Sequence, residues 1–170
     1  LVDTPATAML VHGGHEFFDV LLRMIGDARE ELHLQTYIFD HDETGKEVIA
    51  ALLAAVKRGV RVVVLIDAFG SGGLPQKVVT AMQEAGIEIR LFGPWLSWQS
   101  LHLGRRLHHK VVVVDRKSAL IGGINIADKY KGTNTERAWL DFAVQLESEP
   151  IGNTLAQLCE SLFVKRHFFL

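Results

Sequence analysis

The chain has 170 residues, of which 48% are hydrophobic and 22% are charged, and its formal net charge is -2. This length suits one domain with a sizeable core. The nearly balanced charge lacks the global basic field with which nucleic-acid-binding proteins attract their partners. Cys159 is the single cysteine, which excludes an internal disulfide, and no apolar run in the sequence is long enough to span a membrane.

Hydrophobic periodicity predicts strands and helices that largely alternate along the chain. Strands are predicted at residues 6–11, 31–39, 60–67, 87–92, 111–114, 119–121 and 139–146. Helices are predicted at 15–28, from a capping box at Thr44 and Glu47 to a stop at Gly59, from Pro75 to Gly86, and at 150–168.

The segment 60–67 (VRVVVLID) is nearly all apolar, which indicates a strand covered on both faces. The strand, helix and strand that end with this segment predict a right-handed crossover and a parallel pair. The predicted fold class is therefore α/β.

The second predicted strand alternates, so His33 and Tyr37 share one of its faces. We interpret His33 as a packed strand residue and Tyr37 as a candidate for substrate binding. His41, between Asp40 and Asp42, has the composition of a metal site, but a polar turn that leads into the next helix is the favoured interpretation.

Two irregular stretches follow predicted strands. Residues 68–73 (AFGSGG) are predicted to form a flexible loop at a place where open α/β sheets bind ligands, and they lack the pattern of a nucleotide P-loop. Residues 93–107 contain Trp95, Trp98, Arg105 and Arg106. These side chains are candidates to line the path of an acyl chain or a base, and the alternative is an ordinary loop anchored by apolar side chains.

The most specific pattern is LHHKVVVVDRKSALIGGIN, residues 107–125. The valine run predicts a buried strand, and alternation then places His108 and Lys110 on one face and His109 and Asp115 on the other. A histidine beside a fixed cation on a rigid strand suits chemistry on an anionic group such as a phosphate. Asp115, at the end of the strand, is interpreted as the residue that ties down the following turn.

Two glycines, Gly122 and Gly123, end the return strand. Because they lack side chains, they would let Asn125 and the backbone approach whatever His108 and Lys110 face. In the last predicted strand, Asp141 is a carboxylate within an apolar sheet and needs a partner there, unless it lies at the surface.

The spacing H-x-K-x4-D, followed by x6-G-G-x-N, resembles the signature of the phospholipase D superfamily. The surrounding sequence is similar to sequences of the bacterial cardiolipin synthases. The similar segments are HLQTYIFDHDETGKEVIAALLAAVKRGVRVVVLID, RRLHHKVVVVD and WLDFAVQLES. The resemblance implies a phospholipase D-like mixed β-sheet flanked by helices on both faces, with residues 1–170 forming a single catalytic domain.

The resemblance also implies the site and its chemistry. The implied catalytic set is His108, Lys110, Asn125, Asp115 and Asp141, and the candidates around the substrate are Gly122, Gly123, Tyr37, Trp95, Trp98, Arg105 and Arg106. Asp141 would pair with His108 and fix its imidazole. The implied reaction moves a phosphatidyl group between phospholipids through a phosphohistidine, with no metal and no other cofactor.

That scheme needs two facing histidine motifs, and the chain contains one H-x-K. The second would come from a C-terminal lobe of a longer enzyme, which we favour, or from a second copy in a homodimer. The expected partners are a phospholipid substrate, a membrane surface and that second lobe. The expected location is the cytoplasmic side of a bacterial inner membrane. The alternative function is a homodimeric phosphodiesterase or nuclease, against which the net charge argues.

Overall fold

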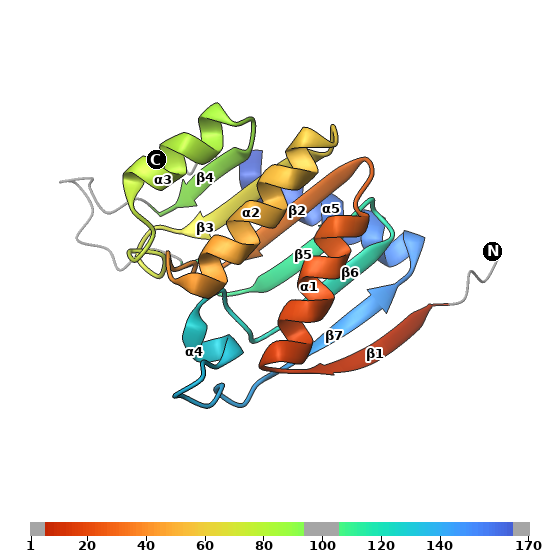
Figure 1. Cartoon of the computed structure of the whole chain (residues 1–170). Coiled ribbons are helices and arrows are strands. Elements are labelled where there is room, and N and C mark those ends of the chain that lie inside the picture. Colours follow the sequence, from red (N-terminus) through yellow and green to blue (C-terminus); the bar gives the residue numbers. More distant parts are fainter. Residues whose placement is uncertain (1–5, 94–105, 165–170) are drawn as a thin grey trace.

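Seven strands form one mixed sheet with helices on both faces (Figure 1). The computed structural model describes residues 6–93 and 106–164. The strands are β1 (Thr7–His12), β2 (Glu31–Thr36), β3 (Arg61–Asp67), β4 (Glu88–Phe92), β5 (Lys110–Val114), β6 (Ser118–Gly122) and β7 (Phe142–Glu147). The helices are α1 (His15–Asp27), α2 (Glu43–Lys57), α3 (Gln76–Glu84), α4 (Asp128–Lys131) and α5 (Glu149–Val164).

The strand order is β1-β7-β6-β5-β2-β3-β4, so β5 lies at the centre of the sheet. Strands β2, β3 and β4 run parallel to one another, whereas β5, β6, β7 and β1 pair with their neighbours in antiparallel fashion. The parallel pair predicted around α2 is therefore confirmed, and the sheet is mixed.

The core lies on both faces of this sheet. The larger cluster joins α1 and α2 to one face, and a smaller one joins α5 to the other through Val111, Val113, Ala119 and Cys159. In β3 every residue from Val62 to Ile66 is at most 2% exposed, as the apolar segment predicted. Burial of each such side chain stabilises the fold by about 1.5–3 kcal/mol.

Several element boundaries differ from the predictions. Strand β7 begins at Phe142 and not at Trp139, whose side chain is exposed together with Leu140. Helix α2 is capped by Asp42, which accepts a hydrogen bond from the Gly45 N–H at 2.9 Å, and not by a box at Thr44. The Thr44 N–H instead donates to the Asp128 carboxylate at 2.8 Å, a contact between segments that are distant in sequence.

The described part of the chain contains no helix of the length and apolarity needed to cross a membrane.

The turn between β5 and β6 is held by Asp115. Its φ of 51° and that of Arg116, 54°, lie in the left-handed region, which suits a tight hairpin turn. The Asp115 carboxylate accepts hydrogen bonds from the backbone N–H groups of Arg29, Glu30 and Glu31 at 2.8–3.0 Å. Asp115 therefore fastens the segment between α1 and β2 as well as occupying its own turn.

We predict that Asp115→Ala lowers the free energy of unfolding by about 1–3 kcal/mol, because three backbone donors lose a charged acceptor. Urea unfolding measures the change. Asp19→Ala, at an exposed position of α1, is the control and should change stability by less than about 0.5 kcal/mol. An Asp115 variant as stable as the parent would contradict this role.

Candidate active site

His108 and Lys110 lie together at the beginning of β5. The His108 side chain is exposed, and its ring centroid is 5.2 Å from that of Tyr37. Lys110 is 8% exposed, its Nζ donates to the His108 carbonyl oxygen at 2.7 Å, and it lies 5.6 Å from the centroid of the Tyr37 ring. The structure therefore brings an accessible imidazole, a held cation and an aromatic ring to one place.

Burial lowers the pKa of Lys110, and the carboxylate of Asp141 acts against that shift. An ammonium group that is largely removed from water interacts more strongly with an anion than a solvated one does. A phosphate that reached this position would meet a cation whose charge is poorly screened.

His109 faces the other side of the sheet, as alternation predicted. Its Nε2 lies 2.7 Å from the Gln35 side-chain oxygen, and the Gln35 amide donates to the Cys159 carbonyl at 2.9 Å. Burial and the nearby Lys110 ammonium lower the pKa of His109. The two neighbouring histidines thus have different surroundings, and His108 is the one beside Tyr37.

Gly122 and Gly123 allow the close approach that the sequence predicted, but the group that approaches Gly123 is Asp141. A Cβ on Gly123 would lie 2.4 Å from the Asp141 carboxylate, and one on Gly122 would lie 2.4 Å from the Phe142 carbonyl oxygen. The predicted pairing of Asp141 with His108 is not formed: among the described residues no hydrogen bond or ion pair joins them. The carboxylate accepts from the Phe142 N–H at 2.8 Å and acts on Lys110 through its charge.

Asn125 is 3% exposed and is bound by protein groups. Its side-chain oxygen accepts from the Ile38 N–H at 2.9 Å, and its amide donates to the Tyr130 hydroxyl at 2.8 Å. This geometry differs from a side chain turned toward a phosphate. Asn125 connects the segment after β2 to α4, and so supports the neighbourhood of Tyr37.

The remaining predicted site residues are dispersed or lie outside the described residues. Asp115 is at the opposite end of β5 from Lys110, where it holds backbone N–H groups, as its predicted role at the turn requires. The guanidinium of Arg106 lies 4.9 Å from the centroid of the Phe69 ring and 3.8 Å from the Asp67 carboxylate. Trp95, Trp98 and Arg105 fall outside the described ranges.

Asp67, the last residue of β3, was not among the predicted site residues. It is 0% exposed, and its carboxylate accepts from the Leu107 N–H, directly before His108, at 2.9 Å. The loop after it, predicted to be flexible, contains a turn that Asp67 also holds. The available signal was a charged residue at the end of an apolar strand, which must find partners when it is buried.

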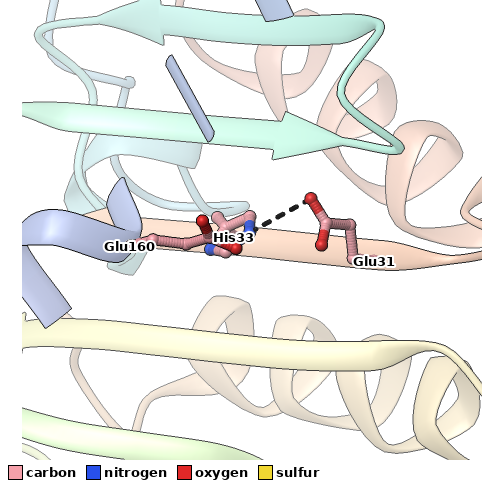
Figure 2. Close-up of side chains that lie close together, drawn as sticks. All are labelled: Glu31, His33 and Glu160. Carbon is pink, nitrogen blue, oxygen red and sulfur yellow. Dashed lines mark ion pairs between the residues drawn. The ribbon is translucent and has the colours of Figure 1, made fainter. Parts of the chain in front are cut away.

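A second polar cluster lies at the other end of the sheet, where His33 is 0% exposed, as expected of the packed residue that was predicted. Figure 2 shows His33 between Glu31 and Glu160. The Nε2 of His33 is 3.4 Å from Glu31, and the side chains of Glu31, His33 and Glu160 are close enough to hold a metal ion. However, Arg116 lies 2.7 Å from both glutamates. A divalent ion would compete with that guanidinium, so we interpret the cluster as an ion-pair network between β2 and α5.

The chain is similar to known proteins over most of its length. The family described as "Cardiolipin synthase, PLD-like domain" matches residues 21–160. The chain is 35% identical over 155 residues to cardiolipin synthase B of Escherichia coli strain K12. The matched region covers 90% of this chain and 38% of that protein. It is 36% identical over 147 residues to cardiolipin synthase 1 of Bacillus cereus, with 85% and 29% covered. The chain thus spans well under half the length of these relatives.

Solved structures share the fold. The phospholipase D family member Nuc from Salmonella typhimurium matches with a TM-score of 0.71 at 19% identity, over 94% of this chain and 95% of that one. The phosphatidylserine synthase of Haemophilus influenzae Rd KW20 matches with a TM-score of 0.72 at 18% identity, over 93% and 37%. These likenesses confirm the predicted α/β architecture.

The polar cluster makes stability depend on pH. Burial lowers the pKa of His33 below its ordinary 6.5, so the unfolded chain takes up a proton at pH values where folded His33 remains neutral. We predict that stability falls as the pH drops through about 6.5, until His33 titrates in the folded protein as well. Thermal melts at about pH 7.5 and 5 measure this loss.

His33→Leu should lose less stability than the parent over that pH interval. His12→Gln, which replaces an exposed histidine, is the control and should lose as much as the parent. Equal losses in the parent and in His33→Leu would show that another group causes the acid sensitivity.

Proposed function

This chain belongs to the phospholipase D-like domain family of the cardiolipin synthases, and we propose that it forms one catalytic lobe of a phosphatidyltransferase. The observation that carries the proposal is the exposed imidazole of His108 beside the buried ammonium of Lys110. A nucleophile or proton carrier next to a fixed positive charge is what displacement at a phosphodiester requires.

The proposed reaction has two balanced steps. One histidine attacks phosphorus, and its N–P bond forms as the P–O bond to the leaving alcohol breaks. A second histidine gives that alkoxide its proton. The second histidine then removes the proton from the acceptor hydroxyl, whose oxygen forms a new P–O bond as the N–P bond breaks. His108 takes one of these two roles.

Lys110 would neutralise the charge that the phosphate oxygens carry in both steps. Because its Nζ is already held by the His108 carbonyl, little reorganisation is needed when the substrate binds. Asp141, which lies against Gly123, would keep the ammonium oriented through its charge. The chain's own residues therefore supply phosphate binding and one of the two proton-carrying histidines.

The other histidine would belong to a second lobe. The chain contains one H-x-K motif and covers 38% of cardiolipin synthase B, which leaves room in such a relative for a further lobe. The partners we propose are that lobe, a phospholipid substrate and a membrane surface. We place the whole protein peripherally at the cytoplasmic side of a bacterial inner membrane.

A homodimeric phosphodiesterase or nuclease is the second candidate function. It is supported by the structural match to Nuc, which covers 94% of this chain and 95% of the Nuc chain, so the two chains are of similar length. In that arrangement two copies of His108 would face each other about a twofold axis. The net charge of -2 offers little attraction for DNA, so we rank this function below the first.

We predict that His108→Ala, in the longer protein that contains both lobes, lowers phosphatidyl transfer between phospholipids in mixed micelles by about 10³-fold or more. The fold should persist, because the His108 side chain is exposed. His109→Ala is the matched control, since that neighbour faces Gln35, and it should retain most of the activity.

Equal losses in the two variants would refute the assignment of His108. Absence of transfer in the parent protein would refute the phosphatidyltransferase itself. Degradation of DNA by this chain alone that disappears in His108→Ala would establish the nuclease instead.

A further inference from the structure

The carboxylate of Asp67 joins two segments that are distant in sequence. One oxygen accepts from the N–H groups of Phe69 and Gly70, both at 3.0 Å, and so closes the turn after β3. The other accepts from the Leu107 N–H at 2.9 Å. Leu107 is 3% exposed and directly precedes His108, so the backbone that carries the imidazole is fastened to β3 immediately before it.

The same turn also supports Tyr37. The Ser71 N–H donates to the Asp67 carbonyl at 2.9 Å, and the Ser71 hydroxyl donates to the Tyr37 carbonyl at 3.0 Å. Gly70 packs against Tyr37 so closely that a Cβ would lie 2.3 Å from its carbonyl oxygen and 2.9 Å from its ring. Asp67 thus holds Gly70 and Ser71 by hydrogen bonds, and these two residues in turn fix the position of Tyr37.

Both routes from Asp67 end at the same contact, since the Tyr37 ring lies 5.2 Å from the His108 ring and 5.6 Å from the Lys110 Nζ. We propose that Asp67 is a positioning residue that sets the orientation of the His108 imidazole against Tyr37 and Lys110. Its relevance to catalysis rests on the proposed function, whereas the geometry it imposes does not.

A carboxylate is the suitable group at this position. Three backbone N–H donors converge on its two oxygens. In an asparagine one of these oxygens is replaced by an NH2 group, which would point at a backbone N–H donor and cannot accept its hydrogen bond. Asp67→Asn therefore keeps the shape of the side chain and removes at least one of the three bonds. If that bond is the one to Leu107, His108 is released from its support.

Asp115 provides a matched control. Its carboxylate also accepts three backbone N–H groups, at 2.8–3.0 Å, but at the other end of β5. Asp115→Asn should perturb stability in a comparable way and leave His108 in place. The comparison separates a loss of stability from a loss of orientation.

The first measurement is NMR of the His108 imidazole in this chain, which needs no turnover. In the parent, the Tyr37 ring should impose a ring-current shift on the His108 resonances. We expect Asp67→Asn to change that shift and Asp115→Asn to preserve it. Unchanged His108 resonances in a folded Asp67→Asn variant would overturn the proposal.

The second measurement is phosphatidyl transfer by the longer protein with both lobes. Asp67→Asn should lower kcat by about tenfold to a hundredfold with little change in KM, as expected when a reacting group is misplaced by about 1 Å. Asp19→Asn, at an exposed position of α1, should leave kcat within about twofold. A parent without transferase activity would contradict the proposed function, while the NMR comparison would still decide the role of Asp67.

Ser71→Ala is the milder variant to use if Asp67→Asn does not fold. It removes the hydroxyl that holds the Tyr37 carbonyl and keeps the Asp67 carboxylate. The Tyr37-dependent shift of His108 should then change as well, and its persistence would overturn the proposal.

Discussion

The ammonium of Lys110, the first residue of the central strand β5, is held against the carbonyl oxygen of His108. Strand alternation turns the side chains of His108 and Lys110 toward the same face, and pairing with β2 and β6 leaves β5 little freedom to shift. Burial keeps water away from the charge and lowers the pKa of Lys110. A rigid strand can therefore present an imidazole and a poorly screened cation together, which a mobile loop does less reliably.

Each end of β5 is held by the same kind of interaction, in which a carboxylate accepts hydrogen bonds from several backbone N–H groups. At one end the Asp115 carboxylate gathers backbone N–H groups from the segment before β2, and at the other the Asp67 carboxylate gathers them from the turn after β3 and from Leu107. In both places a charged acceptor satisfies donors that no strand partner reaches. The first contact supports the fold, whereas the second lies directly before His108, the residue that we propose as catalytic.

The spacing of hydrophobic residues predicted much of the architecture, because strands and helices differ in their hydrophobic periodicity. The run Val111–Val114, the covered strand β3 and the opposite orientations of His108 and His109 all follow from alternation. The position of His108 beside Lys110 could be predicted for the same reason, since the two residues are only two positions apart.

Contacts between distant segments could not be predicted in this way. Asn125 belongs to the implied catalytic set, and the sequence did not show that its side-chain oxygen accepts from a backbone N–H after β2 or that its amide donates to the Tyr130 hydroxyl. Asp141 was expected to pair with His108, but the absence of a side chain on Gly123 leaves space for its carboxylate elsewhere. Asp67 carried no motif, because its importance arises only when the chain brings Leu107 to the end of β3.

The central claim is that the His108 end of β5 is the phosphate-binding site of this lobe. NMR titration of the chain with inorganic phosphate tests it most directly, and Arg61 and Arg116, whose guanidinium groups are paired with Glu160, serve as internal controls. The account predicts that the resonances of His108 and Lys110 shift together and saturate. Shifts confined to Arg61 and Arg116, or no saturable shift at His108 and Lys110, would contradict it.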